Sequence, residues 1–189
     1  SLGAKRPEWN ANGAPITSFA DEANGSLWIG TMGAGLWRVP TDGGVATPVD
    51  RMTRNRAAIP GGEQVMALRH DSANNLWVGT LTGGVTRLAP NGTLLTFRAG
   101  ADPARHLGAD GIMSLYEDHS GRMWIGTFHG GVSIYDPQTA TLTRLEDPSG
   151  ANPWLSSVRA AAIVEDLNGY VWIGTDGQGL LLVDPTSGL

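Results

Sequence analysis

Trp28-Ile29-Gly30-Thr31 is the first of four copies of one tetrapeptide, and these copies decide the fold. The others are Trp77-Val78-Gly79-Thr80, Trp124-Ile125-Gly126-Thr127 and Trp172-Ile173-Gly174-Thr175. Successive tryptophans are 49, 47 and 48 residues apart. A fixed period of this size is typical of an array of identical supersecondary units, so every local feature is interpreted within that repeat.

Each unit divides into short strands separated by Gly, Asn and Asp, which favour tight turns. In the clearest unit, the third, we predict strands at 112–116, 123–127, 132–135 and 142–145, close to the usual strand length. The same pattern in the other units predicts strands at 16–20, 27–31, 36–39, 45–49, 65–68, 76–80, 85–88, 94–97, 160–164, 171–175 and 180–183. The last unit ends without a fourth strand.

We therefore predict an all-β protein, a β-propeller with four blades of four-stranded antiparallel meander sheets. A sheet that is apolar on both faces needs a neighbour on each, and radial stacking supplies both. The predicted division of the chain is a lead-in at 1–15 and blades at 16–62, 63–110, 111–158 and 159–189, the last incomplete.

Three side-chain types of the repeat are assigned to the scaffold. The tryptophans Trp28, Trp77, Trp124 and Trp172 are expected to pack between blades, because burying an indole removes about 200 Å² from water. The glycines two residues later let the next blade approach the backbone closely; they are Gly30, Gly79, Gly126 and Gly174. A carboxylate three residues before a left-handed residue caps the turn after the first strand of each unit. These acids are Glu22, Asp71, Asp118 and Asp166.

Composition excludes several function classes. With 13 basic and 18 acidic residues the formal net charge is −5, which gives no reason to expect contact with nucleic acid or an anionic membrane. There is no cysteine for a disulfide or a thiolate metal site. The apolar runs are far shorter than the ~20 residues that span a bilayer.

No pattern of catalytic or metal-binding residues is found. The four histidines lie in different units without His-x-His spacing, so we expect no metal site. The glycine-rich turns lack the lysine and helix of a phosphate loop, and Gly-x-Ser-x-Gly is absent. Adjacent acids such as Glu117 and Asp118 point to opposite faces of a strand. We predict no catalytic residue, no cofactor and no enzyme activity; a lyase or hydrolase on this scaffold is an alternative that the residues do not favour.

The turn between the second and third strands of each unit, here called the tip, is the candidate ligand site. Tips and inter-blade links share one face of a propeller, and tip side chains that the scaffold does not need are free for recognition. The candidates are Met32, Leu81, Thr82, Phe128, His129, Asp176 and Gln178. Ordinary variation of solvated loops is the alternative interpretation. Arginines in the links add positive charge, which neighbouring acids offset.

The string from Ile112 to Val132, IMSLYEDHSGRMWIGTFHGGV, resembles the two-component regulator propeller repeat. The other units match it with small departures, such as Asn74 in place of glycine and Ala160–Ala162 as a small-residue first strand. The resemblance implies the extracytoplasmic or periplasmic sensor of a membrane-anchored bacterial receptor, with a histidine kinase or diguanylate cyclase as output. It also implies rings of about seven blades, within the range of known propellers.

Four blades are fewer than such a ring, and an open arc exposes an apolar face at each end. We therefore expect either a larger parent protein or self-association, for which two arcs making an eight-bladed ring is the simplest closure. Residues 3–10 of one chain are then expected to supply the outer strand that blade 4 of the other lacks. The favoured function is a non-catalytic sensor of an unknown small molecule or glycan; a structural or protein-interaction propeller without a small ligand is the alternative.

Overall fold

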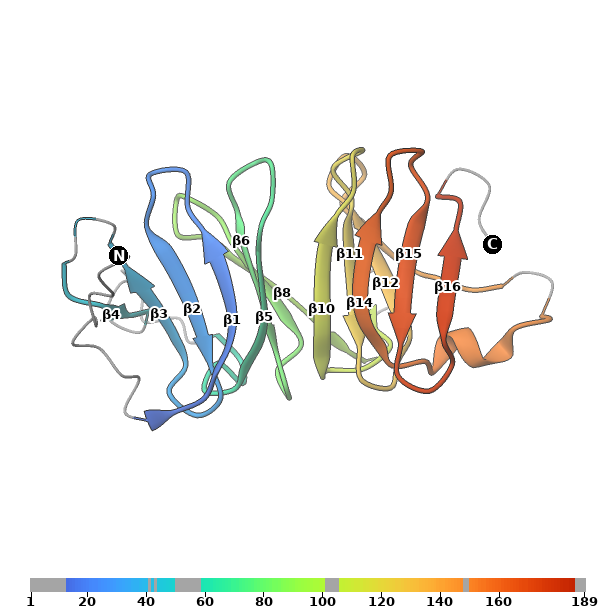
Figure 1. Cartoon of the computed structure of the whole chain (residues 1–189), viewed down its shortest axis with the longest axis horizontal. Helices are drawn as coiled ribbons and strands as arrows, with labels where there is room; N and C mark the ends of the chain where they lie inside the picture. The colour runs from blue at the N-terminus through green and yellow to red at the C-terminus, as the bar shows by residue number, and fades with distance from the viewer. Residues whose placement is uncertain are drawn as a thin grey trace, which may run out of the picture.

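The computed structural model describes residues 13–40, 42, 44–49, 59–100, 106–147 and 150–185. Its regular structure is β, in four sheets that follow one another along the chain, which confirms the predicted fold class (Figure 1). No α-helix occurs among these residues. We call the strands of each blade A to D in chain order.

The strand bounds follow the repeat. Blade 1 contains β1 (Ile16–Asp21), β2 (Leu27–Thr31), β3 (Leu36–Val39) and β4 (Thr47–Pro48). Blade 2 contains β5 (Val65–His70), β6 (Leu76–Thr80), β7 (Val85–Leu88), β8 (Leu94–Ala99) and β9 (His106–Leu107). Blade 3 contains β10 (Ile112–Glu117), β11 (Met123–Thr127), β12 (Val132–Asp136) and β13 (Thr141–Arg144). Blade 4 contains β14 (Ala160–Glu165), β15 (Val171–Thr175) and β16 (Leu180–Val183).

Two links differ from the sequence-based prediction. Blade 2 has five strands instead of four, because β9 pairs in parallel with the free edge of β8. The link before blade 4 contains a 3-10 helix, η3 (Pro153–Ser156). Both features bury one leucine, Leu107 at 1 % exposure and Leu155 at 2 %. Leu107 belongs to the apolar cluster between blades 2 and 3. The predicted strand at residues 3–10 lies outside the described residues.

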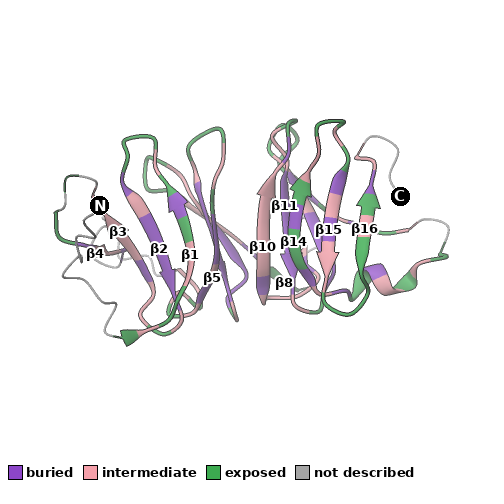
Figure 2. Cartoon of the chain, in the orientation of Figure 1, coloured by how far each residue is buried: buried purple, intermediate pink, exposed green. Residues whose placement is uncertain are grey.

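The A strands of successive blades lie side by side, β1 against β5, β5 against β10 and β10 against β14. The sheets therefore stack as the wedges of a propeller. Figure 1 shows blades 1 and 4 at opposite ends of the molecule, so the four blades form an open arc. In Figure 2 β5 and β11 of the inner blades are mainly buried and β10 is mainly intermediate, whereas β14 and β16 carry exposed segments.

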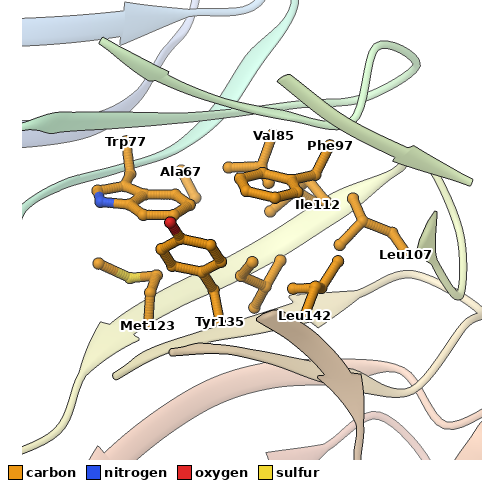
Figure 3. Packing of buried hydrophobic residues seen from close by; sticks show 10 residues of the cluster. Ala67, Trp77, Val85, Phe97, Leu107, Ile112, Met123, Tyr135 and Leu142 are labelled. Carbon is orange, nitrogen blue, oxygen red and sulfur yellow. The ribbon is translucent and has the colours of Figure 1, made fainter. Parts of the chain in front are cut away.

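The largest apolar cluster lies between blades 2 and 3 (Figure 3). Trp77 stacks on Phe97 with ring centroids 6.0 Å apart, and Tyr135 from blade 3 lies 5.4 Å from Trp77 and 5.1 Å from Phe97. Trp124 holds the corresponding place between blades 3 and 4 and is fully buried. Tilted and offset aromatic pairs of this kind add attraction beyond the area they bury.

The glycine of each tetrapeptide receives the first residue of the next blade. A Cβ on Gly30 would lie 2.6 Å from Val65 Cγ1, one on Gly79 would lie 2.5 Å from Ile112 Cγ2, and one on Gly126 would lie 2.6 Å from the carbonyl oxygen of Ala160. None of these distances leaves room for a side chain. On Gly174, at the free end of the arc, a Cβ would meet nothing closer than 3.7 Å.

In blades 2 to 4 the acid closes the turn between strands A and B and also holds the tryptophan. The indole Nε1 of Trp77, Trp124 and Trp172 donates to Asp71, Asp118 and Asp166 at 2.8, 2.8 and 2.9 Å. This hydrogen bond holds the pKa of the Asp166 carboxyl below its usual value. Blade 1 departs from the pattern: Glu22 accepts from Arg38 Nε at 2.7 Å, and the buried Nε1 of Trp28 has no partner among the described residues.

Successive blades are also joined by a hydrogen bond that we call the carboxylate latch. The residue after the turn acid donates its backbone N–H to the carboxylate that ends strand A of the next blade. Ser72 donates to Glu117 at 2.8 Å, and His119 donates to Glu165 at 2.7 Å. Between blades 1 and 2 the carboxylate position is occupied by His70, whose ring nitrogens are buried without a hydrogen-bond partner in the described part of the chain.

His70 makes stability depend on pH. Burial lowers the pKa of His70 from 6.5, while the nearby carboxylates of Glu22, Asp71 and Asp21 act in the opposite direction. A histidine whose pKa is lower in the folded state than in the unfolded state stabilises the fold above the unfolded pKa. This contribution is lost as the pH falls below 6.5. We expect His70→Gln to flatten the decrease in melting temperature between pH 7 and pH 5, measured by circular dichroism. Equal slopes for the two proteins would contradict this assignment.

Candidate functional site

The threonine that ends each tetrapeptide builds the tip that follows it. Thr127 donates its hydroxyl to the carbonyl of Gly131 at 2.9 Å and accepts from the N–H of Gly130 at 2.8 Å. Thr31, Thr80 and Thr175 make the same pair of hydrogen bonds in their blades. The first two tip side chains take no part in this lock, so they vary without loss of the turn.

Each tip is tied to the chain on both sides. The N–H groups of Met32, Leu81, Phe128 and Asp176 donate to the carbonyl just before strand A of their own blade, at 2.8 to 3.0 Å. The tips of the first three blades also donate to the link that enters the next blade; Gly131, for example, donates to Val158 at 3.2 Å. Tips and links therefore share one face of the molecule, which we call the tip face.

On the tip face, Arg159 joins the tips of blades 3 and 4. Its Nη1 lies 2.9 Å from Asp176 Oδ2, and its guanidinium carbon lies 5.7 Å from the centroid of the Phe128 ring. Its Nε is buried and has no hydrogen-bond partner among the described residues. Asp176 keeps 55 % of its side chain exposed. An aromatic face, a partly exposed guanidinium and an accessible carboxylate thus meet at one place, here called the Arg159 cluster.

The structure brings together two of the seven predicted ligand residues, Phe128 and Asp176. Thr82, His129 and Gln178 are exposed on separate tips, and Met32 and Leu81 are half-buried. Sequence reasoning placed Arg159 only among the link arginines. The strand pairing of the hairpin could have placed Arg159 beside Asp176. Ala160 pairs with Thr175, so the residues one step outward, Arg159 and Asp176, face each other.

The other described arginines of the links and D strands are engaged within the protein. Arg98 pairs with Asp110 at 2.8 Å and donates to the carbonyl of Thr82 at 3.1 Å. Hydrogen bonding to Asp110 raises the pKa of Arg98. Arg144 donates to the carbonyls of Gly130 and Ser156. These guanidinium groups hold tips against links, and the expected offset of a link arginine by a link acid is present at Arg98.

A shallow cleft of about 220 Å³ lies between blades 3 and 4 at the turns on the opposite face. It is lined by His119, Ser120, Arg122, Asp136, Gln138 and Pro185. Arg122 is held there by Asp118, whose carboxylate lies 2.8 Å from Arg122 Nε. None of the predicted tip residues lines this cleft. Within the described residues, no group of three or more His, Asp or Glu side chains is arranged to hold a metal ion.

The structural likenesses concern the fold. The extracellular domain of a protein described as a hybrid two-component system of B. thetaiotaomicron aligns with a TM-score of 0.74 and 17 % identity, covering 92 % of this chain and 24 % of that one. PorZ, a surface component of the type-IX secretion system of Porphyromonas gingivalis, aligns with a TM-score of 0.62 and 18 % identity over 89 % of this chain and 26 % of that one. Virginiamycin B lyase from Staphylococcus aureus aligns with a TM-score of 0.60 and 12 % identity over 93 % and 58 %.

The chain therefore spans about a quarter of the extracellular domain that it resembles. No curated protein sequence matches it. The model of the two-component regulator propeller family matches residues 106–129, which run from β9 through the turn of blade 3 to its tip. This match falls on the unit from which the resemblance was predicted. Residues 106–129 thus match the two-component regulator propeller repeat, within a chain that has the β-propeller fold.

Proposed function

We propose that this chain is a non-catalytic sensor segment of an extracytoplasmic bacterial receptor, and that it recognises a small molecule or glycan on its tip face. The observation that carries the proposal is the family repeat at 106–129. The likeness to extracellular domains of two-component systems supports it. The output is then a kinase or a diguanylate cyclase in the same receptor. No helix in the described ranges is long and apolar enough to cross a bilayer.

The Arg159 cluster is the proposed binding point. Ligand sites combine apolar or aromatic surface with a few convergent polar groups, and arginine recognises carboxylates through paired, charge-assisted hydrogen bonds. The Phe128 ring offers a flat surface for the C–H face of a sugar. The exposed part of the Arg159 guanidinium, whose side chain is 39 % exposed, suits a carboxylate, and Asp176 suits hydroxyl groups. An acidic sugar fits this combination better than a neutral one.

The test is a titration of ¹⁵N-labelled protein with D-galacturonate and, as the matched neutral sugar, D-galactose. We expect galacturonate to shift the amide resonances of the tips of blades 3 and 4, with galactose binding at least about tenfold more weakly, which corresponds to ~1.4 kcal/mol. Phe128→Ala should weaken galacturonate binding by a similar factor. Gln138→Ala, in the cleft on the opposite face, is the matched control and should leave it unchanged.

The alternative function is a structural or protein-interaction propeller without a small ligand. Two observations favour it. The tips are tethered to the links, and only two of the seven predicted side chains converge in the described structure. No resonance shift with either sugar would favour this alternative. Shifts confined to the turns around His119 and Gln138 would move the ligand site to the opposite face and overturn the assignment to the Arg159 cluster.

A further inference from the structure

The cleft between blades 3 and 4, on the face opposite the tips, contains two charged side chains that the repeat does not require. Strands B and C pair in the same register in blades 2 and 3. The residue just before strand B is Arg122 in blade 3 and Asn75 in blade 2. The residue opposite it in the hairpin is Asp136 in blade 3 and Ala89 in blade 2. Blade 2 folds without either charge, so the two charges of blade 3 are free for recognition.

The guanidinium group of Arg122 is held in place by the protein. Its Nε donates to Asp118 Oδ2 at 2.8 Å, and its Nη1 donates to the carbonyl of Pro185 at 3.3 Å. Its guanidinium carbon lies 5.9 Å from the centroid of the Trp124 ring. A guanidinium carries more N–H donors than these two contacts use, and 23 % of the side chain is exposed. Arg122 therefore presents further donors to the cleft from a fixed position.

Asp136 supplies a negative charge beside this cation. Its Oδ1 accepts from the N–H of Gln138 at 2.7 Å, and within the described ranges the side chain takes part in no ion pair. Residues opposite each other on neighbouring antiparallel strands have Cβ atoms about 4.5–5.5 Å apart. A small molecule that carries both charges can therefore contact Arg122 and Asp136 together.

His119 adds an acceptor to the same cleft. Its Nδ1 lies within hydrogen-bond distance of Glu165 Oε1, and its Nε2 lies 3.4 Å from Ser120 Oγ. A carboxylate only accepts hydrogen bonds, so Nδ1 carries the proton and Nε2 keeps its lone pair. The side chain is 65 % exposed. The cleft thus combines a fixed cation, a carboxylate and neutral polar groups.

We infer that this cleft binds a free α-amino acid. The α-carboxylate accepts from Arg122, and the α-ammonium donates to Asp136 and to Nε2 of His119. Both charged groups of an α-amino acid are attached to one carbon, which suits a cation and an anion on neighbouring strands. An ion of a single sign is attracted by one of these groups and repelled by the other. The volume of about 220 Å³ accommodates a small side chain.

The first experiment is a titration of ¹⁵N-labelled protein with L-alanine. Propionate, which lacks the ammonium group, and ethylamine, which lacks the carboxylate, are the matched ligands. We expect L-alanine to shift the amide resonances of residues 119–122 and 136–139. Each matched ligand should bind about tenfold more weakly, since it loses a hydrogen bond between charged groups.

Three results of this titration would overturn the inference. They are the absence of shifts, equal affinities for L-alanine and propionate, and shifts confined to the tips of blades 3 and 4. The sugar-binding proposal for the Arg159 cluster is read from the tip resonances and from other ligands, so either assignment can fail while the other holds.

Arg122→Asn and Asp136→Ala introduce the residues of blade 2 into blade 3. Asn75 donates to both carboxylate oxygens of Asp71, at 3.0 and 2.8 Å, so asparagine at position 122 should preserve the turn, which the melting temperature checks. We expect each variant to bind L-alanine about tenfold more weakly. Asp136→Ala should retain the affinity for propionate. Asn91→Ala, in the corresponding turn of blade 2, is the matched control and should bind L-alanine unchanged. Unaltered L-alanine binding by both blade 3 variants would contradict the assignment.

Discussion

Trp124→Ala should lower the free energy of unfolding by about 3–5 kcal/mol, the range for truncating a buried large aromatic side chain. Trp124 is fully buried between blades 3 and 4, and its Nε1 donates to Asp118, which is itself 4 % exposed. Alanine therefore leaves a cavity and also removes one donor from a buried carboxylate. Urea unfolding followed by tryptophan fluorescence and circular dichroism measures the loss.

Trp172→Ala is the matched control for this prediction. Trp172 makes the same bond to Asp166, but it lies at the free end of the arc and is half-buried. Both substitutions are compared in the otherwise unaltered chain. We expect a loss of about 1–2 kcal/mol for Trp172→Ala, in proportion to the smaller buried area. Equal losses at the two sites would contradict the role of blade packing.

Gly79→Ala should lower the free energy of unfolding by about 1–3 kcal/mol, although only a methyl group is added. Its Cβ would lie 2.5 Å from Ile112 Cγ2 and 2.9 Å from Ile112 Cβ, and Ile112 is fully buried. The methyl group must push blade 3 away from blade 2. The loss of stability therefore comes from steric overlap and not from backbone strain, because Gly79 has no positive φ angle.

Gly174→Ala has the opposite expected sign. Its Cβ would meet only Ala162 of its own sheet, at 3.7 Å, which is ordinary van der Waals contact. Alanine also reduces the flexibility of the unfolded chain, so stability should be unchanged or rise by about 0.5 kcal/mol. A loss at position 174 as large as that at position 79 would show that the glycines serve the strand backbone and not the approach of the next blade.

Much of the fold could be predicted because the repeat places the same residue types at the same structural positions. The strand range 123–127 was predicted with the bounds of β11, since turn residues mark both of its ends. The left-handed residue after each turn acid was also predicted, and Asn74, with φ at 62°, adopts that conformation in place of glycine. Local turn chemistry and strand alternation are properties of neighbouring residues, so the sequence displays them directly.

The parts that the sequence did not predict depend on contacts between units. Residues 106–107 have no strand pattern of their own; they become β9 because β8 offers a free edge. The partner of an indole Nε1 lies six residues before it, as in Asp118 and Trp124, and only the folded hairpin brings the two together. Arg159 was overlooked at the candidate site for a similar reason, since its two partners come from two different blades.

The threonine lock separates the turn from the side chains displayed on it. A hydroxyl and two backbone groups within five positions fix the conformation of each tip, so the turn does not constrain which side chains are exposed on it. Point mutations can therefore change what one blade recognises while its neighbours stay as they are. Duplication of such a unit copies the blade together with its first two tip positions, which are free to diverge. A new binding specificity can therefore arise without a change of fold.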